Sequence, residues 1–74
     1  MNIKAADQND RAVGRRIRAA CQKLRVSQTA LAARLGISPG QVGKYEGGIN
    51  RIPATRLADI AKGLGLPITH LLPR

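Results

Sequence analysis

The 74-residue sequence contains no phenylalanine and no tryptophan, and Tyr45 is its single tyrosine. A hydrophobic core must therefore be built from leucine, isoleucine, valine and alanine, and in so short a chain that core will be thin. A single aromatic ring also cannot form the stacking platform on which single-stranded nucleic acids bind. We therefore expect one small domain, in which self-association would add buried area.

Cysteine and histidine are equally scarce, since Cys21 and His70 are the only examples. One cysteine excludes an internal disulfide, and one histidine beside it cannot complete a zinc site. We interpret Cys21 as a small core residue, and we expect neither a metal nor another cofactor. The sequence also brings no acid, base and nucleophile together, and Glu46 and Asp59 have no carboxylate partner nearby. An enzyme is therefore not expected.

Long apolar runs are absent as well. None approaches the roughly 20 residues that are needed to span a bilayer. The first ten residues, MNIKAADQND, also lack the apolar centre of a signal peptide. We therefore expect a cytoplasmic protein without a membrane partner, and we interpret residues 1–9 as a flexible arm before a domain at residues 10–74.

Acidic residues are few, with four Asp and Glu against thirteen Lys and Arg, for a net charge of +9. The imbalance is concentrated between residues 11 and 44, where eight basic residues and no acidic residue occur. A surface of one sign suits a polyanion, whereas a surface that serves only solubility usually mixes both signs. This distribution favours a nucleic acid as the partner.

The features that are present begin with two short predicted helices, at residues 28–35 and 39–46, joined by a tight turn. Gly36 permits the left-handed conformation that ends the first of these helices. Ser38 then offers a hydroxyl for N-capping, and Pro39 fits the first helical position. This pattern is typical of a helix-turn-helix.

Apolar periodicity predicts two more helices and a final turn. One spans residues 10–24 and has basic residues on its other face, and one spans residues 54–64. A last turn or short helix contains the apolar residues of the tail. We therefore expect an all-α fold, a compact bundle of about five short helices that includes a helix-turn-helix. The apolar stripes of the two long helices are Val13, Ile17, Ala20, Cys21, Leu24, Leu57, Ile60, Ala61 and Leu64.

The predicted helix at residues 39–46 has a slender outer face without acidic residues. Its outward residues are Pro39, Gly40, Gln41, Gly43 and Lys44. Each glycine costs about 1 kcal/mol in helix propensity. The helix must therefore gain something from being slim, either close packing or close approach to a ligand such as a DNA groove.

Together these residues resemble the Cro and repressor class of helix-turn-helix domains, often called XRE-like. The resemblance extends over about residues 13–72, nearly the whole chain, and it implies a lambda-repressor-like fold. The segments that match the family pattern are Ser27-Gln28, Leu31-Ala32, Gly36, Tyr45-Glu46-Gly47-Gly48 and Ala61-Lys62-Gly63-Leu64-Gly65.

The resemblance implies a transcriptional regulator, and in particular a repressor, that binds a double-stranded DNA operator as a homodimer. In such domains the third helix enters the major groove and the start of the second meets the backbone. By position, the resemblance assigns base reading to Gln41, Lys44, Gly40 and Pro39, and phosphate contacts to Gln28, Ser38, Asn50, Arg51 and Arg34. The apolar tail is then either the closing layer of the core or a dimer seam.

Two positions depart from the family pattern. Pro39 stands where the family often has a polar, base-reading side chain, which shifts base reading to later residues of that helix. Cys21 stands where many relatives have an arginine that pairs with the glutamate corresponding to Glu46. A buried carboxylate without a partner is costly. We therefore expect Glu46 to be partly exposed or to find another donor, such as Arg18 or Arg25.

Other readings of the chain remain open. An antitoxin would also bind DNA, but it needs a segment for its toxin partner, and 74 residues leave little room for one. A cationic membrane-active peptide is disfavoured by the capped turns. The chain could also be the DNA-binding domain of a longer protein, with a linker that begins near residues 71–74.

Overall fold

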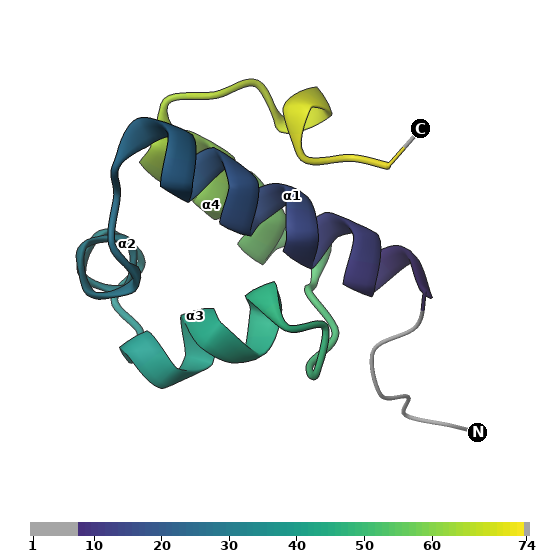
Figure 1. Cartoon of the computed structure of the whole chain (residues 1–74), viewed down its shortest axis with the longest axis horizontal. Helices are drawn as coiled ribbons and strands as arrows, with labels where there is room; N and C mark the ends of the chain where they lie inside the picture. The colour runs from purple at the N-terminus through teal and green to yellow at the C-terminus, as the bar shows by residue number, and fades with distance from the viewer. Residues whose placement is uncertain (1–7, 74) are drawn as a thin grey trace.

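The computed structural model describes residues 8–73, and this part of the chain is helical without strands (Figure 1). The helices are α1 (Gln8–Leu24), α2 (Gln28–Leu35), α3 (Pro39–Glu46) and α4 (Ala54–Leu64), followed by the 3-10 turn η1 (Ile68–His70). The all-α prediction is confirmed, but the expected count of about five helices becomes four α-helices and one 3-10 turn. The last element has only three residues, too few for an α-helix.

Local capping fixes the ends of α2 and α3 where the sequence placed them. The Ser27 hydroxyl oxygen accepts a hydrogen bond from the Ala30 amide at 3.0 Å, and the Ser38 hydroxyl oxygen accepts one from Gln41 at 3.1 Å. Gly36 ends α2 with a φ of 71°, in the left-handed region. These bonds join residues three apart or fewer, so they form without help from the rest of the fold.

The start of α1 differs from the expectation. The helix begins at Gln8, two residues before the predicted start, and Asp10 lies inside its first turn. The Asp10 carboxylate accepts a hydrogen bond from the Ile52 amide at 3.2 Å, which ties α1 to the loop before α4. Gln8 and Asn9, which were predicted to belong to a flexible arm at residues 1–9, lie in α1. The rest of that predicted arm, residues 1–7, lies outside the described residues.

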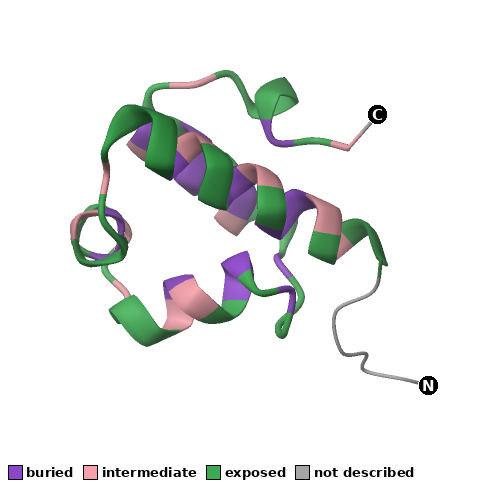
Figure 2. Ribbon diagram, viewed as in Figure 1, coloured by how far each residue is buried: buried purple, intermediate pink, exposed green. Residues whose placement is uncertain are grey.

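The core lies between the four helices, and the C-terminal segment packs on α4, on the side of α1 away from α3 (Figures 1 and 2). Its fully buried large side chains are Ile17, Leu31, Val42, Ile60 and Leu71. Tyr45 is also buried. The core is therefore aliphatic apart from one ring, as the composition required.

The apolar tail serves the core in part. Leu71 is fully buried and closes the core against α4, whereas Ile68 and Leu72 are 38% and 40% exposed. Leu24, expected in the buried stripe of α1, is 43% exposed. The reason is that η1 packs on α4 and leaves a hollow beside the last turns of α1.

The helices α1 and α3 cross at Gly14, a residue that the sequence pattern did not single out. A methyl group on Gly14 would overlap the carbonyl oxygen of Tyr45 and lie 2.8 Å from that of Glu46. Real side chains do not approach backbone atoms so closely, so this crossing requires glycine.

No helix in residues 8–73 combines the length and hydropathy that crossing a membrane demands.

Candidate nucleic-acid interface

The structure leaves most of the predicted site residues at the surface. Gln41 is half-buried, and the others are exposed, namely Pro39, Gly40, Lys44, Gln28, Ser38, Arg34, Asn50 and Arg51. The helices α2 and α3 pack directly on each other. Their mutual packing holds Gln28, at the start of α2, close to Gly43 on α3.

The two glycines of α3 are not required by the packing of the fold. A methyl group on Gly40 would have only the Ser38 hydroxyl oxygen within 4 Å, at 3.9 Å. On Gly43 it would lie 3.6 Å from Nε2 of Gln28, an ordinary van der Waals distance. Close packing within the domain therefore does not explain the glycine at either position. Close approach of a ligand remains.

The buried carboxylate of Glu46 is satisfied by neutral donors. Glu46 is only 7% exposed, and its Oε1 accepts a hydrogen bond from Nε2 of Gln28 at 2.8 Å. The Cys21 thiol also donates to this carboxylate. The alternative of a partly exposed Glu46 is wrong, and the alternative of a new donor is correct. That donor is Gln28 rather than Arg18 or Arg25, because the packing of α2 on α3 places the Gln28 amide beside the carboxylate.

The thiol of Cys21 has a raised pKa, so the pH dependence of stability can test its burial beside Glu46. Burial is the largest cause and the neighbouring Glu46 charge the second, and together they raise the pKa from 9.0 to about 11. The folded protein thus holds the proton more tightly than the unfolded chain does. The stability that this provides is complete below pH 9 and is lost as the pH rises towards 11.

We therefore expect the free energy of unfolding, measured with urea at pH 8 to 11, to fall more steeply for the parent protein than for Cys21→Ala. Both proteins share Tyr45 and every lysine, so the difference between the two curves isolates the thiol. Parallel curves would contradict a thiol that is buried against Glu46.

The loop after α3 is fixed at both ends. The amides of Ile49 and Asn50 donate to the Lys44 carbonyl at 2.9 and 3.4 Å, and Ile52 is tied to Asp10. A methyl group on Gly48, whose φ is 69°, would lie 2.5 Å from Cγ of Arg11, so this loop also packs closely on α1. Asn50 and Arg51 are therefore held next to the C-terminal end of α3.

Arg34 belongs to a different part of the surface. Its Nη1 donates to the Gly63 carbonyl of α4 at 2.8 Å, while Nη1 of Arg56 donates to the Leu35 carbonyl at 3.4 Å. These two bonds join the ends of α2 and α4. The structure thus places Ser38 at the start of α3 and Gln28 against its C-terminal half, and it directs Arg34 towards α4.

The face formed by α2 and α3 has no acidic residue on its surface. Among the described residues the acids are Asp10, Glu46 and Asp59. Glu46 is buried and the other two lie on α1 and α4. Helix N-termini expose free N–H groups and a positive partial charge, which suits phosphate. This face can therefore accept an anionic ligand without repulsion.

Comparison with known proteins gives a consistent family. Residues 17–71 match the family model described as helix-turn-helix, HTH_3. An uncharacterized transcriptional regulator in the ATPase CF(0) region of Rhodospirillum rubrum is 49% identical over 61 residues, which cover 82% of this chain and 56% of that protein. The chain spans about half the length of this regulator and of two further curated relatives.

Solved structures share the same fold. The DNA-binding domain of BldD has a TM-score of 0.81 and 26% identity, covering 89% of this chain and 96% of that one. Hydroxypropylphosphonic acid epoxidase from S. wedmorenis has a TM-score of 0.82 and 27% identity, but the match covers only 35% of that longer chain. With the family model matching most of its length, the chain belongs to the helix-turn-helix family, in the XRE-like class that its sequence resembles.

Proposed function

We propose that this chain is a DNA-binding transcriptional regulator that inserts α3 into the major groove of an operator. The observation that carries the proposal is the exposed, acid-free face of α3, whose glycines the packing does not need. Similarity to proteins named HTH-type transcriptional regulators supports it, as does similarity to a domain described as DNA-binding. Its place of action is then the cytoplasm, with the operator.

Base reading falls mainly to Gln41 and Lys44. A glutamine amide can make paired hydrogen bonds with adenine, and a lysine can reach the acceptors of guanine. Pro39 and Gly40 offer shape and close backbone approach instead of side-chain donors. The selectivity of the domain thus depends on two side chains one turn apart on α3.

Phosphate binding falls to Gln28, Ser38, Asn50 and Arg51. Glu46 holds one N–H of the Gln28 amide, which leaves the second N–H and the free amides at the start of α2 for a phosphate. The Ser38 hydroxyl oxygen already accepts from Gln41, so its proton is available to donate. We leave Arg34 out of this set because its guanidinium is directed to α4.

As a repressor, the protein would act by occupying its operator as a homodimer. Ile68 and Leu72 are the exposed apolar residues of the C-terminal segment, and they provide a candidate seam. Two copies would place their α3 helices about 34 Å apart, one turn of DNA, which matches a palindromic site.

Selection from a pool of random duplexes, followed by sequencing, tests this function. We expect an enriched palindrome. Uniform weak binding without a motif would instead favour an antitoxin or scaffold role.

Two variants then test the assignment of α3. Lys44→Ala should relax the base preference, because it removes a groove contact, whereas Gln28→Ala should weaken all sequences alike. Circular dichroism verifies that both variants are folded. The reverse pattern would overturn the placement of α3 in the groove.

A further inference from the structure

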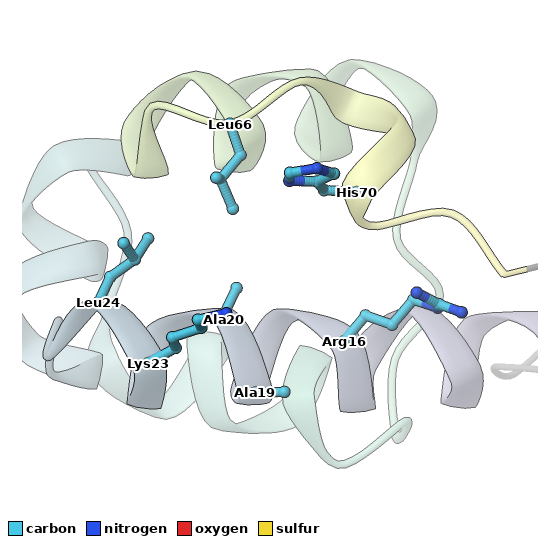
Figure 3. A pocket seen from close by; sticks show the side chains of 7 residues that line it. All are labelled: Arg16, Ala19, Ala20, Lys23, Leu24, Leu66 and His70. Atoms are coloured by element: carbon cyan, nitrogen blue, oxygen red, sulfur yellow. The ribbon is translucent and has the colours of Figure 1, made fainter.

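A hollow of about 330 Å³ lies between the C-terminal half of α1 and the segment at residues 66–70 (Figure 3). It is on the side of α1 opposite α3, so the proposed DNA contacts do not use it (Figure 1). Figure 3 shows Leu24, Ala20 and Leu66 around the opening between the two walls. Its volume falls within the range of small-molecule sites.

The hollow exists because its C-terminal wall, at residues 66–70, is held in place by α4 rather than by α1. The turn η1 packs on α4, and Leu71 anchors it in the core. The opposing residues of α1 include Ala19 and Ala20, whose side chains are too short to fill the gap. Leu24, the last residue of the apolar stripe of α1, is consequently 43% exposed.

The chemistry of the lining has two parts. Ala19, Ala20, Leu24 and Leu66 provide apolar surface, and Arg16, Lys23 and His70 provide donors from both walls. The lining includes no acidic residue. A second hollow, which shares Arg16 and Ala19, continues along α1 and adds Arg15. Arg16 and Leu24 are separated by about 12 Å along the helix, at 1.5 Å per residue.

The geometry points to a binding site for a small monoanion with an apolar tail, such as a medium-chain carboxylate. The tail would cover the alanines and leucines, and the carboxylate would bind Arg16 or Lys23 at the rim. A second copy of this chain is a poorer occupant, because it would bring the same cations against these. The bound ligand would contact both α1 and the C-terminal segment, which in its absence packs on α4.

Titration of the ¹⁵N-labelled protein with octanoate tests the site. We expect saturable amide shifts concentrated at Ala19, Ala20, Lys23, Leu66 and His70. Acetate has the charge without the tail, and 1-octanol has the tail without the charge, so both should bind much more weakly. Octanol binding as tightly as octanoate would contradict the role of the cations.

Variants separate this site from general attraction to a cationic protein. Ala20→Leu should abolish the local shifts by filling the hollow, and Ala19→Leu repeats the test at an exposed position that cannot disturb the core. Arg16→Gln with Lys23→Gln should weaken binding about fivefold or more, given the modest energy of exposed ion pairs. Arg18→Gln with Lys62→Gln removes the same charge outside the hollow and should have little effect.

Two results would overturn the proposal. One is equal weakening of octanoate binding by both pairs of charge variants. The other is a set of shifts at Ala19, Ala20 and Lys23 of α1 that depends on protein concentration but not on octanoate, because a second copy then covers the hollow itself and not only the proposed seam at Ile68 and Leu72. Operator binding is measured separately, so failure here leaves the proposed DNA-binding function standing.

Discussion

Replacing Gly14 with alanine is expected to lower the free energy of unfolding by about 3 kcal/mol, the upper end of the usual cost of overpacking. The added methyl group would meet two backbone carbonyl oxygens of α3, at Tyr45 and Glu46. Backbone cannot rotate away as a side chain can, so α1 and α3 would have to separate. That separation would also withdraw the Tyr45 ring from the core.

The loss would be large for this protein. A domain of 74 residues has a total stability of roughly 4 to 11 kcal/mol. Urea denaturation followed by circular dichroism measures the loss directly, and the midpoint of thermal unfolding should fall by roughly 12 to 24 °C.

Gly43→Ala is the matched control. It is also a helical glycine, but a methyl group there has room, at 3.6 Å from Gln28. It should raise the stability by about 1 kcal/mol through helix propensity. If Gly14→Ala gained stability in the same way, the close crossing of α1 and α3 would be refuted.

Raising the salt concentration from 50 to 200 mM is expected to lower the operator affinity about tenfold, on the basis of about two neutralised phosphates. Arg51 of two copies would supply the two cations. Each phosphate contact releases condensed counterions, so the logarithm of the affinity falls linearly with the logarithm of the salt concentration. Fluorescence anisotropy with a labelled operator gives the slope.

The contribution of the loop can be isolated by a charge-matched pair of variants. Arg51→Gln removes one proposed contact from each copy and should make the slope shallower by about 2. Lys62→Gln removes the same charge from α4 and should leave the slope unchanged. Equal changes in both variants would mean that the overall charge of the domain acts, and not a contact made by Arg51.

Much of the fold could be predicted because its helix ends are decided locally. The bounds of α2, α3 and α4 agree with the sequence prediction. The hydroxyl groups of Ser27 and Ser38 each accept a hydrogen bond from the amide three residues later, and Gly36 and Gly65 end helices in the left-handed conformation. The predicted helix start was wrong where a side chain bonds to a residue far along the chain. The helix α1 begins at Gln8 rather than at residue 10, and the Asp10 carboxylate in its first turn bonds to the amide of Ile52, 42 residues away.

The candidate site likewise has features that the sequence predicted and features that it did not. The outward face of α3 follows from helical periodicity, and its lack of acidic residues follows from composition. The partner of Glu46 does not follow, because Gln28 is 18 residues away and reaches it only through the packing of α2 on α3. The separation of Arg34 from the other predicted phosphate residues depends on its bond to Gly63, 29 residues away.

The sequence by itself thus determined the helices, the charge of the surface and the family to which the chain belongs. These depend on composition and on hydrogen bonds between near neighbours. Only the tertiary structure decided that Gly14 sets the approach of α1 to α3, that Glu46 is buried, and that Leu71 enters the core while Leu72 does not. Each of these depends on which atoms of distant segments meet, and that is set by how whole helices pack.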